Sequence, residues 1–184
     1  MAYNIKDVFY LSTSCDIAAT TAGVGSAQLD LSAYIDPIAR GRTKGTGLAV
    51  YKAHFSMLGQ DGQPLPAGET GVMVASLQAG LGVGDNDTGT AFAFDDTMTS
   101  NTNALNVATV NFYGPGAGAS GGFLTDMVKP STEVPYVIVR DNVCLVYGQE
   151  AQFTVAANIS VRLECAQITL DQATLNQLLR TQTV

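Results

Sequence analysis

His54 is the only histidine among the 184 residues and the one obvious candidate for a general base. A Ser-His-Asp system needs that histidine beside an activated serine, which often sits on a Gly-x-Ser-x-Gly turn. No such turn occurs in the chain, and Lys52 and Ser56 place His54 on the polar side of an alternating segment. The sequence therefore predicts an ordinary strand residue here, and a protein that is not an enzyme and has no small-molecule substrate or cofactor.

The three cysteines are Cys15, Cys144 and Cys165. An odd number of cysteines without a Cys-x-x-Cys pair argues against a disulfide framework, and one histidine with scattered cysteines makes no zinc pattern. We expect buried thiols in a chain made in a reducing compartment.

A calcium site is the remaining metal candidate. Asp85 and Asp87 carry carboxylate oxygens at alternating positions, as in the first part of a calcium loop. The glycine at position six and the glutamate at position twelve of such a loop are both missing. The simpler interpretation of this stretch is a solvated turn. The alternative is a calcium ion shared between subunits.

A small basic patch lies between two predicted strands, where Arg40, Arg42 and Lys44 fall within five positions. Such a patch is a candidate for contact with a polyanion, either nucleic acid or anionic lipid headgroups. The simpler interpretation is a loop whose cations pair with acidic neighbours. No arginine-rich arm precedes the first strand, which argues against a large role in neutralising a genome.

Charge is scarce over the whole chain. Only 14% of the residues are charged, against about 25% in ordinary globular domains, and the formal net charge is −7. No apolar run approaches the roughly 18 residues of a transmembrane helix, and the N-terminus lacks the pattern of a signal peptide. Such a surface is typical of a subunit covered by neighbouring copies, or alternatively of a secreted β-domain.

The elements that position these residues are predicted to be strands. Residues 152–165 alternate between polar and apolar, which indicates a long strand with one face in a core. Its apolar positions are Phe153, Val155, Ala157, Ile159, Val161, Leu163 and Cys165. Shorter segments of the same kind are 7–13, 27–35, 47–58, 72–81, 105–113, 136–140 and 143–147.

Turns and loops separate these segments and indicate the fold class. Residues 59–64 form a predicted loop between antiparallel strands, Asp141 and Asn142 a predicted turn, and residues 80–103 and 114–122 two long loops. About eight strands without βαβ alternation predict an all-β antiparallel sandwich. We expect one domain over residues 1–184.

A short helix is predicted over residues 170–180. Thr169 and Gln172 have the spacing of a capping box, and Asp171 also lies near the start. Leucines 175, 178 and 179 form an apolar stripe, so the helix must dock on its own sheet or on a neighbour. We expect Leu175, Leu178 and Leu179 to contact another subunit.

The strand pattern, the uncharged loops and the low charge together resemble single jelly-roll capsid proteins of icosahedral viruses. Residues 28–37 (QLDLSAYIDP) and 47–55 (GLAVYKAHF) are similar to early strands in such proteins. The resemblance implies a jelly-roll sandwich that assembles with copies of itself into a closed shell, located in the virion and made in the host cytoplasm. A second coat protein, an internal membrane or the genome would be further contacts.

A binding module is the alternative from a different class, either a carbohydrate-recognising sandwich or a phage tail or fibre domain. Such modules usually present aromatic side chains in a groove, whereas this chain has no tryptophan and only 8% aromatic residues.

Overall fold

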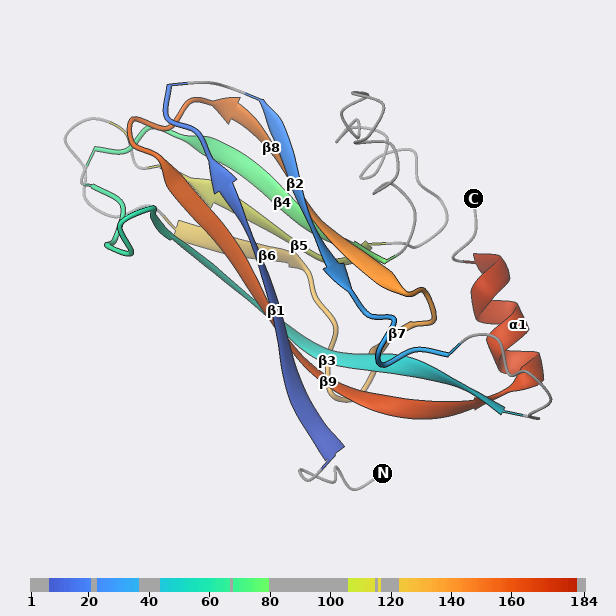
Figure 1. The fold of residues 1–184 in the computed structure, drawn as a ribbon. Helices are drawn as coiled ribbons and strands as arrows, with labels where there is room; N and C mark the ends of the chain where they lie inside the picture. The colour runs from blue at the N-terminus through green and yellow to red at the C-terminus, as the bar shows by residue number, and fades with distance from the viewer. Residues whose placement is uncertain are drawn as a thin grey trace.

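The computed structural model describes residues 7–20, 23–36, 44–66, 68–79, 106–114, 116 and 123–181. Its strands form two antiparallel sheets that face each other as a sandwich (Figure 1). The first sheet has the order β1 (Val8–Ile17), β9 (Ala157–Asp171), β3 (Lys44–Gly59) and β7 (Tyr136–Ile138). The second has the order β2 (Val24–Asp30), β8 (Asn142–Ala151), β4 (Val72–Ala79), β5 (Asn106–Tyr113) and β6 (Phe123–Val128).

The strand pairs are nested along the chain. β1 pairs with β9, β2 with β8, β3 with β7, and β4 with β5, each time antiparallel. The chain thus folds back on itself as one long double ribbon, which wraps so that successive pairs fall in opposite sheets. This eight-strand arrangement is that of a jelly roll, and β6 extends the second sheet by one strand. The fold is an antiparallel β-sandwich of jelly-roll type.

The core consists of inward-facing side chains from both sheets. Fully buried members include Ile17, Leu48, Leu145, Ile159 and Leu163. Alternate positions of each strand point into this layer, so the period of two in the sequence becomes one buried and one outer face.

The long strand predicted over residues 152–165 is displaced in the structure, where β9 runs over Ala157–Asp171. The predicted core positions from Ala157 to Cys165 are buried, and Phe153 is buried although it precedes the strand. Val155 is 37% exposed, so its predicted place in the core is wrong. It lies in a bend between β8 and β9, because the backbone there bonds to Glu69 instead of to a strand.

Several other boundaries differ from the predictions. β6 was not predicted at all, and β1 continues to Ile17, beyond the expected end at residue 13. Residues 59–64 form a tight turn in which Gly62 has a φ of +78°, but the connection leads from the first sheet to the second and is no hairpin. Likewise, the predicted turn at Asp141 and Asn142 joins β7 and β8, which lie in different sheets.

The C-terminal helix α1 (Gln172–Thr181) follows β9 directly, close to the predicted range. Its cap is Asp171, whose Oδ1 accepts a hydrogen bond of 2.7 Å from the amide of Thr174. Thr169 lies inside β9, so the predicted capping box with Gln172 does not form. The bond from Thr174 lowers the pKa of Asp171, as expected for a carboxylate that accepts a backbone amide.

Candidate functional site

The outer face of the first sheet presents a regular polar lattice. The registers of β1 and β3 on the central strand β9 align outward side chains in rungs of three, one from each strand. In the order β1, β9, β3, the four rungs are Tyr10–Glu164–Lys52, Ser12–Arg162–His54, Ser14–Ser160–Ser56 and Asp16–Asn158–Leu58.

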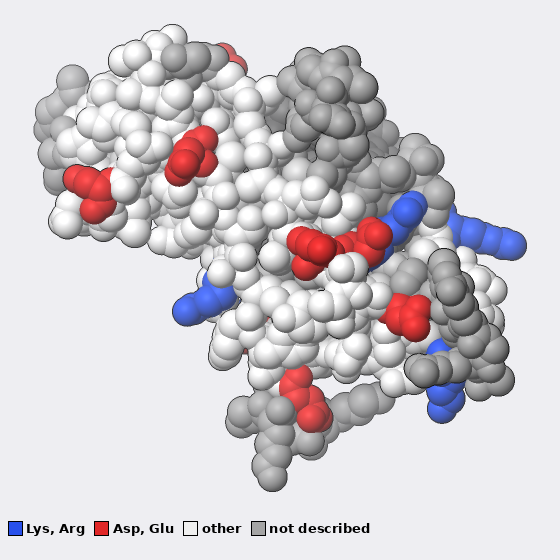
Figure 2. Space-filling model, viewed as in Figure 1, with Lys and Arg blue, Asp and Glu red and all other residues white. Residues whose placement is uncertain are grey.

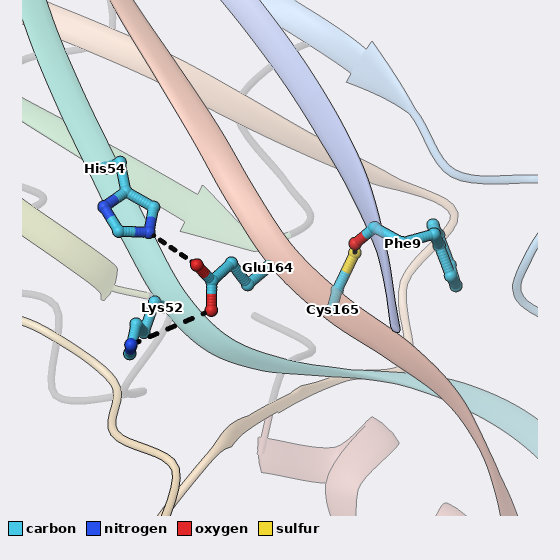
Figure 3. Close-up of polar contacts among 5 residues, drawn as sticks. All are labelled: Phe9, Lys52, His54, Glu164 and Cys165. Carbon is cyan, nitrogen blue, oxygen red and sulfur yellow. Dashed lines mark hydrogen bonds and ion pairs between the residues drawn. The ribbon is translucent and has the colours of Figure 1, made fainter. Parts of the chain in front are cut away.

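Glu164 is the centre of the first charged group in this lattice. His54 Nε2 lies 2.9 Å from Glu164 Oε1, and Lys52 Nζ lies 3.9 Å from Glu164 Oε2 (Figure 3). Both partners reach from β3 across to β9, and their side chains are about half exposed. Since an open pair of this kind contributes about 0–1 kcal/mol, we interpret the group mainly as a way of orienting the three side chains.

Arg162, one rung further along β9, has a different environment. Its guanidinium carbon lies 5.6 Å from the centre of the Tyr10 ring, a cation–π contact. Among the described residues, no carboxylate forms an ion pair with Arg162. Its N–H donors therefore stay available to a ligand from solvent.

Beside Arg162 the surface is hollowed. The third rung consists of three serines, which are far shorter than the arginine, histidine and asparagine of the rungs on either side. We call this depression the serine hollow, defined by Ser14, Ser56 and Ser160. Together with the neighbouring rungs it forms an open groove of about 580 Å³, also lined by Arg162 and His54. Ser160 Oγ donates to the carbonyl of Ser56 at 3.4 Å.

The far wall of the groove carries one carboxylate, Asp16, in the rung next to the serines. Asn158 Nδ2 donates to Asp16 Oδ1 at 2.8 Å, so the one carboxylate at this end is already hydrogen-bonded. The groove consequently combines hydroxyl groups along its floor with the guanidinium of Arg162 at one end and the carboxylate of Asp16 at the other. Such a set can bind hydroxylated molecules and, at the Arg162 end, an anion. His54 lies at the same end, where its Nε2 is 2.9 Å from Glu164 Oε1.

All three cysteines are buried free thiols, as expected from the sequence. Burial raises the pKa of Cys15 to about 11 and that of Cys165 to about 12, and it also raises the pKa of Cys144. Cys165 Sγ lies 3.5 Å from the carbonyl oxygen of Phe9 on β1 (Figure 3). These thiols are core side chains of low reactivity.

A second feature lies at the end of the sandwich where β1 joins β2, β3 joins β4, β5 joins β6, and β8 joins β9; we call it the loop end (Figure 1). Glu69 bonds to three of these connections, all except the one from β1 to β2, and is 1% exposed. Its carboxylate accepts bonds from the Thr154 hydroxyl at 2.7 Å and from the amides of Thr154, Thr70 and Gly71. Its own carbonyl accepts from Gly116.

The pKa of Glu69 reflects two opposing effects. Burial alone would raise it, but the hydrogen bonds from Thr154, Gly71 and Thr70 outweigh burial and lower the pKa below its ordinary value of 4.5. The carboxylate is thus a charged, fully bonded clamp between the β3–β4 and β8–β9 connections, and the backbone carbonyl of Glu69 adds the β5–β6 connection through Gly116. Gly114 fits into the same cluster, because a Cβ there would come within 2.5 Å of the Glu69 carbonyl oxygen.

Around this fixed end, four large apolar side chains are exposed. We call them the loop rim: Val24, Leu58, Tyr113 and Val155, between 37% and 46% exposed. They come from the start of β2, the ends of β3 and β5, and the β8–β9 connection. In Figure 2 this part of the surface is largely uncharged, with isolated acidic groups. Because these four side chains are exposed at the same end of the sandwich, we treat the loop rim as a candidate contact region.

The structure locates some of the site residues predicted from the sequence. Lys44 is exposed at the start of β3, opposite Asp171 in the register with β9. The other two members of the basic patch, Arg40 and Arg42, lie outside the described residues, as do the calcium candidates Asp85 and Asp87. Within the described ranges, no cluster of three or more His, Cys, Asp or Glu side chains suited to a metal ion occurs.

The three helix leucines divide into two groups. Leu175 is fully buried within its own subunit, where its Cδ2 would lie 2.6 Å from a Cβ on Gly45 of β3. It therefore docks α1 on the first sheet. Leu178 and Leu179 are half-buried and keep surface for a further contact. No helix in the described part of the chain has the length and apolar character needed to cross a membrane.

Sequence reasoning missed the serine hollow and the Glu69 clamp. Ser56 and Ser160 stand at polar positions of predicted strands, while Ser14 lies just beyond the predicted end of its strand. Only the register between β1, β9 and β3 brings the three into one rung. Glu69 gives no signal in a pattern of alternation, because it lies in a loop and its partner Thr154 is far away in the chain.

Comparison with known proteins assigns this chain to no family. No family model matches the sequence, and no curated protein matches it. Among solved structures, the chain is similar to Merkel cell polyomavirus VP1 in complex with GD1a oligosaccharide, with 6% identity, a TM-score of 0.39, and coverage of 92% of this chain and 98% of that chain. At so low a TM-score, the assignment of the fold depends on the strand pairing described above.

Proposed function

We propose that this chain is a coat protein that assembles with copies of itself into a closed icosahedral viral shell. The observation that carries the proposal is the loop rim, four exposed apolar side chains fixed on a rigid, largely uncharged end of a jelly roll. A free domain usually has about 25–35% charged residues on its surface, whereas this whole chain has 14%. Contact with neighbouring copies would cover the rim and account for the scarcity of charge.

Repetition would supply the stability of such a shell. Symmetric closed assemblies use the same patches on every subunit, and each interface needs about 1,200–2,000 Å² of total buried area. Leu178 and Leu179 are our candidates for a second contact region. The cations Arg40, Arg42 and Lys44 would touch the genome or an internal membrane, and a second coat protein would be a further partner.

The test is the state of association of the purified chain. Sedimentation velocity and negative-stain electron microscopy should show particles or sheets at micromolar concentration. The double variant Val24→Asp/Val155→Asp should stay folded but lose assembly, because two charges cannot be buried in an apolar contact. Val134→Asp is the matched control, since Val134 is 75% exposed but lies in the β6–β7 connection, away from the loop rim.

Two outcomes would overturn the proposal. One is a lone 19.2 kDa species at every salt concentration and pH. The other is equal loss of assembly in the loop-rim variant and in Val134→Asp, which would mean that any added charge is enough.

A β-sandwich binding module, of carbohydrate-recognising or phage tail or fibre type, is the second candidate, and the serine hollow favours it. The two functions separate in the same experiment. A discrete monomer with affinity for a ligand would support the module, and particles would support the shell.

A further inference from the structure

The serine hollow has the chemistry of a ligand site independent of any assembly. Its floor carries the hydroxyls of Ser14, Ser56 and Ser160, about 4.8 Å apart across neighbouring strands. Each hydroxyl is a donor and an acceptor. Among the described residues, the only hydrogen bond within this rung is the long one from Ser160 to the carbonyl of Ser56. Most of the hydrogen-bonding capacity of the floor therefore faces the groove.

The basic side chains of the groove lie at one end, opposite the Asp16 carboxylate. Lys52 and His54 share the single carboxylate of Glu164, while Arg162 meets only the face of the Tyr10 ring. The ring supports the guanidinium from one side and leaves its N–H fork open. A guanidinium fork matches the two oxygens of a carboxylate or sulfate.

We propose that the serine hollow binds an acidic saccharide, with its carboxylate or sulfate on Arg162 and its hydroxyls on the three serines. The groove volume of about 580 Å³ is far larger than a free ion needs and fits a ligand of one or two sugar rings. Nucleic acid is disfavoured, because phosphate backbones need several unpaired cations, whereas the ligand proposed here needs one guanidinium, that of Arg162. The binding is weak, since the groove is open to solvent.

Isothermal titration calorimetry on the full chain tests this site, with a sulfated chondroitin disaccharide as the probe. Arg162→Ala should weaken binding at least tenfold. Ser160→Val should weaken it at least fivefold, because it fills the hollow and removes the central hydroxyl without changing the charge. Arg180→Ala is the matched control: it removes the same charge from an exposed arginine on α1 and should leave the affinity within twofold.

Two further probes distinguish an acidic saccharide from a free anion as the ligand. Inorganic sulfate and a neutral disaccharide should each bind at least tenfold more weakly than the sulfated disaccharide, since each makes only half of the contacts. Inorganic sulfate that binds as well as the disaccharide would overturn the saccharide assignment. Equal losses in Arg162→Ala and Arg180→Ala would overturn the site itself. Circular dichroism of each variant checks the fold. Sedimentation measures assembly separately, so the saccharide site and the coat-protein function can each be disproved without the other.

Discussion

A single buried carboxylate organises the loop end. Glu69 accepts bonds from Thr154, Thr70 and Gly71, and these residues come from two connections that are far apart in the chain. A buried charge is costly unless it is fully hydrogen-bonded. The same bonds that offset this cost also fix the backbone at Thr154, immediately before Val155, where the apolar side chain stays at the surface.

The pH dependence of stability should reveal the Glu69 clamp. Because its folded pKa lies below 4.5, the carboxylate stabilises the fold fully above the unfolded pKa, and this contribution is lost as the pH falls through the folded pKa. Glu69→Gln should cost about 2 kcal/mol at pH 7 and flatten the fall of the melting temperature between pH 5 and 3 relative to wild type. Thermal melts at several pH values measure both effects.

Asp61→Asn is a suitable control for that experiment, because Asp61 is an exposed loop carboxylate whose hydrogen bond within the described part of the chain comes from the nearby amide of Gln63. Its melts should follow those of the wild type. A Glu69→Gln protein with the wild-type pH profile would show that the carboxylate does not hold the loops.

At the scale of elements, alternation in the sequence predicted the faces of strands better than their ends. The inward positions of β9 from Ala157 to Cys165 follow the predicted alternation because burial acts on every second residue. The end of the strand depends on other parts of the chain. Phe153 and Val155 are both apolar and both fall on the inward side of the predicted alternation, yet only Phe153 is buried. The reason is that Glu69 and Thr154 bend the backbone between them. The sequence of β6 alternates too little between polar and apolar residues for the strand to be predicted.

The helix α1 depends on a single docking side chain. Leu175 is fully buried against Gly45, where the absence of a side chain makes room for it. A helix of about ten residues is marginal alone. Leu175→Ala should therefore cost about 3 kcal/mol and loosen α1 from the sheet. Urea unfolding followed by circular dichroism gives the loss of stability.

Gln177→Ala is the control on the same helix. Gln177 is exposed, and its truncation should change the free energy of unfolding by less than about 0.5 kcal/mol. Equal stability of Leu175→Ala and Gln177→Ala would mean that α1 is not anchored through Leu175.

At the scale of the molecule, β3 links two candidate contact regions. Gly45 at its start receives α1, and Leu58 near its end belongs to the loop rim. Gly45 and Leu58 are thirteen residues apart on β3, so at about 3.3 Å per residue the strand holds the two regions roughly 40 Å apart. A subunit with different contact patches at its two ends forms head-to-tail contacts, which close into rings or shells when the rotation between copies allows it. The nested pairing that creates this geometry joins the first strand to the last, and local sequence patterns do not reveal such long-range partners.

The half-buried helix leucines offer the last test of this geometry. Leu178→Asp should leave a folded subunit, because Leu175 still docks α1, but it should abolish particles by placing a charge in the contact. Gln177→Asp adds the same charge at the neighbouring exposed position and should assemble like the wild type. Sedimentation velocity at equal protein concentration compares the three proteins. If Leu178→Asp still forms particles of normal size, α1 lies outside the interface, and the loop rim must meet a different part of the neighbouring copy.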